Sequence, residues 1–188
     1  MVNPNKADFI RDLGKVNVKA LKAAVLSLSE SVWGIDNHTK PNKFEVLQNT
    51  QHIVFKFVSD LQDVTTSYAR KMWPLMKLHI EPVITQAVGS YEYADGDFPR
   101  IMLAKLPPGG RITPHFDGKV AYPHKIHIPL QTNDATFFYI EDKEYHFAEG
   151  FAYEVNNLRK HAAVNNGSTD RIHLIFEYYD KRAYLQAR

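Results

Sequence analysis

Histidine is the residue type that first suggests chemistry in this chain of 188 residues. It occurs nine times, and six of the nine lie between positions 115 and 173. Neither the net charge nor a globular core requires such a cluster. Imidazole groups gather by chance, for hydrogen bonding in a core, or for metal binding and acid–base chemistry. The six are His115, His124, His127, His146, His161 and His173.

The segment PHFD places His115 two residues before Asp117. In an extended chain, residues i and i+2 project from the same face, so both side chains could reach one ion. A histidine from a distant strand would complete a facial triad of two histidines and one carboxylate. Such a triad holds Fe(II) and leaves coordination positions open. Alone, the pair is a weak signal, because most chance occurrences are surface residues.

His161 and Arg171 are the distant residues that strengthen this hypothesis. His161 follows an expected strand, and Arg171 opens the last one. Jelly-roll dioxygenases need a distal histidine on iron and, deeper in the barrel, a cation for the far carboxylate of 2-oxoglutarate. Arginine suits that role because its rigid fork pairs bidentately with a carboxylate and stays charged when buried. A core histidine and a salt-bridged arginine are the alternative, and for either residue alone they are favoured.

The elements that must position these residues change character halfway along the chain. In the first half, Val18–Leu28 has apolar residues at the spacing of one helix face. His52–Val58 has the composition of a strand. Val64–Val88 returns to helical spacing, which Pro74 and Pro82 must interrupt or bound.

The second half consists of short runs of aromatic and β-branched residues, separated by turn-forming segments such as PPGG and NNGSTD. Many short strands at close spacing favour an antiparallel sandwich or barrel. The expected strands are Ile101–Leu106, Lys125–Gln131, Thr136–Ile140, Tyr145–Phe147, Phe151–Val155 and Ile172–Tyr179.

These patterns predict a single domain over residues 1–188, of the α+β class and rich in β-structure. We expect a double-stranded β-helix of the jelly-roll or cupin-like type with a mainly helical N-terminal cap. The cap, with one or two strands, is expected at about 1–95 and the catalytic jelly roll at about 96–180.

Composition excludes several other classes. Lys and Arg total 23 against 21 Asp and Glu, which gives no electrostatic footprint for nucleic acid or an anionic membrane. Cysteine is absent, so no disulfide, thiolate nucleophile or iron–sulfur cluster can form. The N-terminus lacks an apolar signal core and no apolar run approaches a bilayer span, so we expect a soluble, cytoplasmic protein. No G-x-S-x-G, H-E-x-x-H or Gly-rich phosphate loop is present.

Three ordered blocks resemble the aspartyl/asparaginyl β-hydroxylase family. They are LAKLPPGGRITPHFD, HKIHIPLQTN and EGFAYEVNNLRKHAAVNNGSTDRIHLIFEYYD, and the resemblance runs from about Phe98 to Asp180. The family consists of dioxygenases that depend on Fe(II) and 2-oxoglutarate and use O2, and it includes some bacterial proline hydroxylases. The ordered blocks are far more specific than the His-x-Asp pair alone.

The resemblance implies roles for six residues. The expected iron ligands are His115, Asp117 and His161, and the expected 2-oxoglutarate contacts are Arg171, His127 and Lys125. Many members have arginine where this chain has Lys125. The resemblance therefore implies that a lysine, rather than an arginine, makes the second cationic contact to 2-oxoglutarate here. The membrane-bound animal members lack the carboxylate ligand that Asp117 supplies here. This difference makes the chain look more like the small bacterial members.

Other polar residues have weaker claims. We expect His173 to share the inward face of Arg171, as a neighbour of the site or as a core histidine. Asn156 and Asn157 match a family pair that orients the metal site or caps a turn. His124 and His146 are expected at the surface or in turns. Asp95, Asp97 and Arg100 lie where a substrate could enter, but a solvated loop is the stronger interpretation.

The resemblance implies hydroxylation of a C–H bond of an amino acid, with release of succinate and CO2. The substrate is free, such as proline, aspartate or asparagine, or it is a residue of a peptide or protein. One alternative is a cupin-like metalloprotein with other chemistry, which would not need Arg171. Another is a non-catalytic jelly-roll binding module. We expect no nucleic-acid or membrane partner, and the sequence leaves the oligomeric state open.

Overall fold

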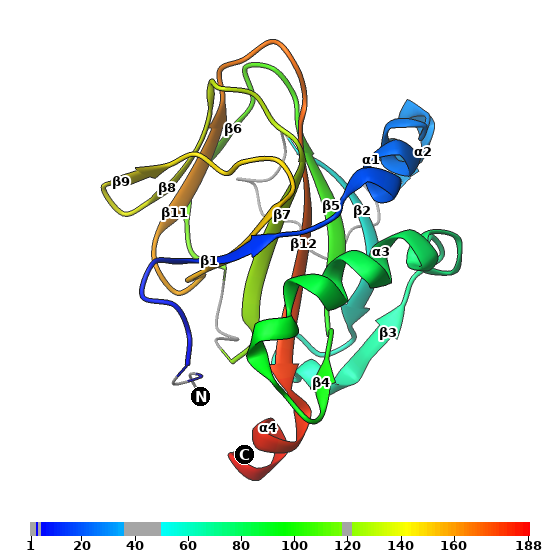
Figure 1. Ribbon diagram of the computed structural model, residues 1–188, viewed down its shortest axis with the longest axis vertical. Coiled ribbons are helices and arrows are strands. Elements are labelled where there is room, and N and C mark those ends of the chain that lie inside the picture. Colours follow the sequence, from blue (N-terminus) through cyan, green and yellow to red (C-terminus); the bar gives the residue numbers. More distant parts are fainter. Residues whose placement is uncertain (1–2, 4, 36–49, 118–121) are drawn as a thin grey trace.

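Two antiparallel β-sheets frame the protein in the computed structural model, which describes residues 3, 5–35, 50–117 and 122–188 (Figure 1). The larger sheet runs in the order β1 (Ile10–Lys15), β10 (Phe151–Val155), β7 (His124–Gln131), β12 (Arg171–Asp180), β5 (Ile101–Leu106), β2 (Gln51–Val58) and β3 (Ser67–Ala69), and β4 (Gly96–Asp97) pairs with β12. The smaller sheet runs in the order β6 (Arg111–His115), β11 (His161–Asn165), β8 (Thr136–Ile140) and β9 (Lys143–Tyr145).

Helices cover one face of the larger sheet. They are α1 (Lys19–Leu26), α2 (Glu30–Ile35) and α3 (Trp73–Ala87), followed in the chain by the short 3-10 turn η3 (Gly89–Tyr91). The other short elements are η2 (Val64–Thr66) and α4 (Lys181–Gln186). Leu21 of α1 and Ile80 of α3 are fully buried and belong to one apolar cluster with Leu103 and Ile128 of the sheet. Figure 1 shows these helices gathered on that side.

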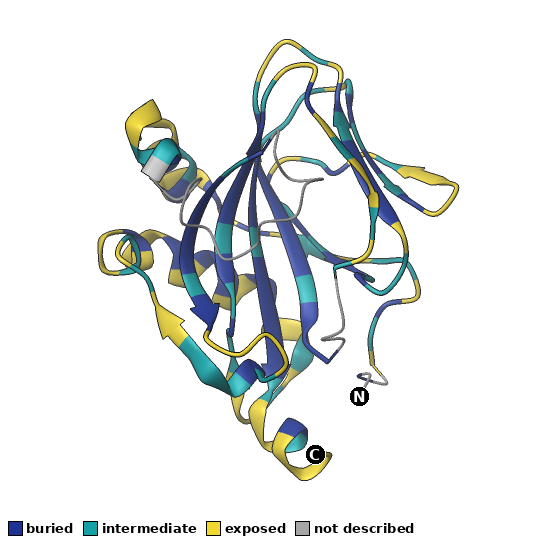
Figure 2. Cartoon of the chain, turned by 180° about the vertical axis from the view of Figure 1, so that it is seen from behind, coloured by how far each residue is buried: buried dark blue, intermediate teal, exposed yellow. Residues whose placement is uncertain are grey.

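A second apolar cluster fills the space between the two sheets. Its buried members include Leu106 of β5, Phe138 and Ile140 of β8, and Val155 of β10. Strand β5 is apolar throughout except for Lys105 because both of its faces are covered, one by helices and the other by the smaller sheet. Figure 2 shows the strands of the larger sheet mostly buried.

Several expected elements agree with the structure. Strands β5, β8 and β10 have the expected bounds, and β2, β7 and β12 differ from the expected ranges by at most one residue at either end. Helix α1 lies within Val18–Leu28, and Pro74 stands in the first turn of α3, as expected of a bounding proline. The antiparallel two-sheet architecture confirms the expected β-rich jelly roll.

Other expectations were wrong. Val64–Val88 is not one helical segment, because η2 and β3 precede α3. Pro82 lies inside α3 without ending it. It is on the exposed side of the helix, where water can bind the carbonyl that its missing N–H leaves free. Strand β9 comes two residues earlier than expected.

The region expected as a mainly helical cap also contributes strands. From residues 1–95, β1, β2 and β3 join the larger sheet, with β1 paired to β10 and β2 to β5. Among the described residues, no helix is both long enough and apolar enough to span a bilayer.

Helix α3 offers a matched test of the outer core. Ile80 is fully buried and Leu78, on the same helix, is 76% exposed. We expect Ile80→Ala to lower the free energy of unfolding by about 2–5 kcal/mol, because it leaves a cavity beneath the helix. Leu78→Ala should change it by no more than about 0.5 kcal/mol. Urea unfolding measures both; similar losses in the two variants would contradict the packing described.

Candidate metal centre

His115, Asp117 and His161 meet at one edge of the smaller sheet. His115 ends β6 and His161 begins β11, and the two residues are direct partners in the antiparallel register. Their rings are 4.4 Å apart between centroids. Asp117 follows β6, and one ligand atom from each of the three residues lies within 4.8 Å of the others. The sequence spacing therefore predicted a real spatial cluster.

Backbone carbonyls hold both imidazoles in one tautomer. Nδ1 of His115 lies 2.8 Å from the Thr113 oxygen, and Nδ1 of His161 lies 2.9 Å from the Arg159 oxygen. A carbonyl only accepts, so each Nδ1 donates and each Nε2 carries a free lone pair. The two Nε2 atoms lie 3.7 and 3.5 Å from Oδ1 of Asp117. Two oriented imidazoles and one carboxylate fit the donor set that Fe(II) takes in facial triads.

Lys125 keeps the third member of the triad ionised. Its ammonium donates to Oδ2 of Asp117. Burial would raise the pKa of the Asp117 carboxyl, but Lys125 and the two imidazoles lower it more, so the pKa lies well below its ordinary value. The carboxylate is therefore charged and ready to bind a cation.

Arg171 is a buried cation deeper between the sheets. It begins β12, is 2% exposed, and donates to Nδ1 of His173 over 3.0 Å. Among the described residues, no carboxylate forms an ion pair with it. Burial lowers the pKa of Arg171 to about 9, which still leaves it charged at neutral pH. A buried charge without a counter-ion is costly, so the position favours an anionic ligand.

His127 lies between the triad and Arg171. Its ring centroid is 5.6 Å from that of Phe138, which stacks on His161, and 5.9 Å from that of His173. Burial, with the charges of Lys125 and Arg171, holds the pKa of His127 well below its ordinary range, so the ring is neutral. Its Nδ1 is buried and has no hydrogen-bond partner within the described part of the chain. Buried nitrogen atoms are normally hydrogen-bonded, so this Nδ1 is available to bind a ligand.

His173, Asn156 and Asn157, the weaker candidates from the sequence, lie in different surroundings. His173 faces inward with Arg171, as expected. Burial and the charge of Arg171 hold the pKa of His173 well below its ordinary value. Asn156 caps the N-terminal segment by donating to the oxygens of Ala7 and Asp8. Asn157 touches the metal site through its main-chain oxygen, which accepts from the Asp117 amide at 3.5 Å.

The expectations for His124 and Arg100 were wrong. His124 is fully buried, with Nδ1 2.6 Å from Glu154, and Tyr93 and Asn3 bind its other nitrogen. His146 is half-buried and donates to the Thr136 oxygen. Arg100 is not part of a solvated loop, because it forms a largely buried ion pair with Glu177. Sequence analysis did not single out Glu177, because its position opposite Lys125 is set by strand register, which no local sequence pattern reports.

Comparison with protein families finds one match. The sequence profile of the family described as "Aspartyl/Asparaginyl beta-hydroxylase" matches residues 68–181, more than half of the chain. No curated protein sequence matches this chain significantly.

Solved structures share the fold at low sequence identity. A viral collagen prolyl hydroxylase from Paramecium bursaria Chlorella virus-1, solved as a 2OG complex, has a TM-score of 0.56 at 8% identity, covering 92% of this chain and 96% of the viral one. AviO1 from Streptomyces viridochromogenes has a TM-score of 0.58 at 13% identity, covering 94% and 91%. An oxidoreductase of the 2OG-Fe(II) oxygenase family from Burkholderia pseudomallei has a TM-score of 0.53 at 11% identity. The alignment covers 70% of this chain and 66% of that protein.

Metal titration tests the triad. We expect His115→Ala, Asp117→Ala and His161→Ala each to weaken Mn(II) binding by about 100-fold or more, because even residues that only orient metal ligands contribute about 10- to 100-fold. His146→Ala is the matched histidine control and should bind as the wild type does. Calorimetry measures the affinities. Unchanged binding in any of the three triad variants would remove that residue from the ligand set.

Proposed function

Because the chain belongs to the aspartyl/asparaginyl β-hydroxylase family and is by that membership a 2-oxoglutarate-dependent hydroxylase, we propose the following reaction. A C–H bond of an amino acid, either free or within a peptide, becomes C–OH. One atom of O2 enters this hydroxyl group and the other enters succinate, while 2-oxoglutarate loses CO2. The atoms and electrons balance without a further reductant.

The triad is the proposed iron site. His115 and His161 would bind Fe(II) through Nε2 and Asp117 through its carboxylate, since the carbonyls of Thr113 and Arg159 already hold both rings in the required tautomer. Bound iron supplies the activation of O2 and the oxidation of the C–H bond. The role of the protein is to orient these three ligands and to leave the remaining positions open.

The buried charge of Arg171 is the observation that carries the 2-oxoglutarate assignment. Its guanidinium would bind the far carboxylate of the cosubstrate bidentately. The unpaired Nδ1 of His127 is the proposed second contact, placed between Arg171 and the triad. Lys125 would supply a further cation near the metal. It now contacts Asp117, and a bound cation on that carboxylate would weaken the contact and free the ammonium for an anionic ligand.

Aromatic rings pack against His127 at the proposed cosubstrate site. Phe138 and Phe147 stack on one another at 5.2 Å and lie against His127, and Phe138 also stacks on His161. Both phenylalanine side chains are buried, so the proposed cosubstrate site is bordered by apolar surface. An apolar border strengthens the charge pairing on which the proposed cosubstrate binding depends.

An anaerobic titration tests the assignment without knowledge of the substrate. Addition of 2-oxoglutarate to the Fe(II)-loaded protein should produce the visible metal-to-ligand charge-transfer band. Arg171→Ala should raise the apparent Kd for 2-oxoglutarate by about 30-fold or more, the effect of removing one partner of a buried charge pair. Mn(II) binding should be retained.

Arg111→Ala is the arginine control, because Arg111 is exposed on β6 and lies outside the proposed site. It should give the wild-type band and affinity. Metal binding by the wild type without any band would contradict the oxygenase mechanism and favour other cupin-like metal chemistry. Loss of metal binding in Arg171→Ala would mean that the arginine supports the fold rather than the cosubstrate.

A further inference from the structure

A buried ion pair lies beyond Lys125 on the inner face of the larger sheet. Glu177 of β12 is directly opposite Lys125 of β7 in the antiparallel register. Opposed residues project from the same face, and Lys125 contacts Asp117 of the triad. Glu177 therefore faces the same interior as the proposed metal site. Its Oε2 lies 2.6 Å from Arg100, and the two side chains are only 10% and 12% exposed.

An apolar wall stands beside this pair. Val54, Phe57 and Val58 of β2 form a small cluster with Met102 of β5. Val54 and Met102 are opposed across β2 and β5, and the guanidinium of Arg100 lies 5.5 Å from the centre of the Phe57 ring. An anion, a cation and an apolar surface therefore adjoin one another.

The ion pair is not needed to join the strands. The amide of Glu177 already donates to the main-chain oxygen of Arg100 over 2.9 Å, and β5 and β12 pair along their length. Burying two charges to reinforce this junction gives little stability, because desolvation offsets most of the attraction. The same two charges are well suited to a ligand that carries one of each sign.

Charged groups of both signs lie close together around this ion pair. Lys6, on the N-terminal segment, donates to the Pro123 oxygen. Burial lowers its pKa to about 8, against the opposing effect of nearby acidic groups that include Glu177. The cations Lys6, Arg100 and Lys125 adjoin the acidic Glu154, Glu177 and Asp117. A ligand with one positive and one negative charge enters such a site without changing its net charge.

We propose, on the basis of the proposed function, that Arg100 and Glu177 select a free α-amino acid with an apolar side chain as substrate. Glu177 accepts hydrogen bonds from the α-ammonium, and Arg100 binds the α-carboxylate. The side chain lies against the wall of Val54, Phe57 and Met102. A residue within a peptide carries neither charge, so it cannot replace the internal ion pair in this way.

Substrate analogues separate the two charges. The Fe(II)-loaded protein with 2-oxoglutarate is assayed for succinate formation with free proline, leucine and valine, with their N-acetyl and amide derivatives, and with aspartate and asparagine. We expect free apolar amino acids to stimulate succinate formation. Blocking either charged group should raise KM by about 30-fold or more, as expected when one charge of a buried pair loses its partner. Aspartate and asparagine should be weaker, because the wall offers their side chains no polar partner.

Variants assign the charges to residues. Glu177→Gln should raise KM for the free amino acid and reduce its advantage over the N-acetyl form, because the ammonium no longer finds a carboxylate. Arg100→Gln should reduce the advantage over the amide instead. In both variants, the 2-oxoglutarate band without substrate should keep its wild-type affinity. Glu177→Asp and Arg100→Lys keep the charges and serve if a glutamine variant fails to fold.

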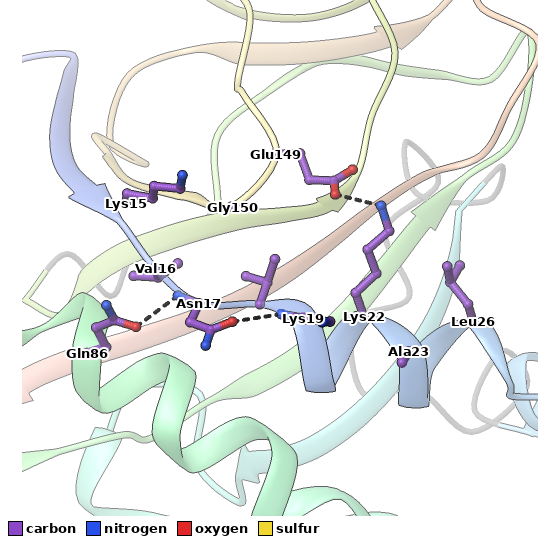
Figure 3. Close-up of a pocket in the computed structure, with 11 residues that line it drawn as sticks. Lys15, Val16, Asn17, Lys19, Lys22, Ala23, Leu26, Gln86, Glu149 and Gly150 are labelled. Carbon is purple, nitrogen blue, oxygen red and sulfur yellow. Dashed lines mark hydrogen bonds and ion pairs between the residues drawn. The ribbon is translucent and has the colours of Figure 1, made fainter.

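The control is an ion pair of equal length on the other side of the sheet. Lys22 and Glu149 are 2.6 Å apart in a surface groove beside α1 (Figure 3). Glu149→Gln removes one charge, as Glu177→Gln does, and should leave KM unchanged. Turnover of peptides but not of free amino acids, or unchanged analogue preferences in the Glu177 and Arg100 variants, would overturn the inference. A wild-type charge-transfer band with no succinate formation in response to any amino acid would overturn this inference but leave the proposed function intact. Absence of the charge-transfer band would contradict the proposed function itself.

Discussion

A guanidinium buried without a carboxylate partner is the constraint on which the interior of this protein depends. Arg171 is 2% exposed, and the one polar contact that the described structure records for its guanidinium is the neutral ring of His173. Desolvating such a charge costs several kcal/mol in real proteins. Burial, together with the charge of Arg171, holds the pKa values of His127 and His173 well below their ordinary range. An interior of this kind becomes electrostatically balanced only when an anion enters it.

Strand β12 carries both Arg171 and the proposed substrate-binding Glu177. Along β12, the side chains of Arg171, His173, Ile175 and Glu177 alternate onto the inner face. The strand therefore carries the proposed cosubstrate anchor at one end and the proposed substrate anchor toward the other. The triad comes from the opposite side, from the smaller sheet, where β6 and β11 bring two histidines into register. Packing of two sheets face to face is what brings cosubstrate, metal and substrate positions into one space.

The sequence predicted best those elements whose composition is dictated by burial. Strands β5 and β10 are short runs of apolar or aromatic residues between turn segments, and both have the expected bounds. Strand β6 escaped prediction because RITPH is largely polar and exposed. The histidine that ends it is explained by the proposed metal site rather than by packing. Strand β1 escaped because IRDLGK contains a glycine at a bulge and three charged residues.

The residues of the site also differ in whether a local sequence pattern predicts them. His115, Asp117, His161 and Arg171 could be proposed from local spacing and from family resemblance, because each belongs to a short ordered block. The Arg100–Glu177 pair joins residues far apart in the chain through strand register, and no local pattern reports register. His124 resembled a turn residue in sequence, yet it is buried because Glu154 on the neighbouring strand gives it a charged partner. Which distant polar residues pair with one another could not be predicted from the sequence, because strand register decides it.

The most direct measurement compares two ligands that differ only at the far carboxylate. The melting temperature of the Mn(II)-loaded protein is recorded with 2-oxoglutarate and with 2-oxopentanoate, which has the same chain length but lacks that carboxylate. Selective binding of 2-oxoglutarate at 100 times its Kd stabilises the fold by about 2.7 kcal/mol, so its melting temperature should rise clearly. The analogue at the same concentration should have little effect. Equal shifts with both ligands, or no shift with either, would contradict a cosubstrate site built on Arg171.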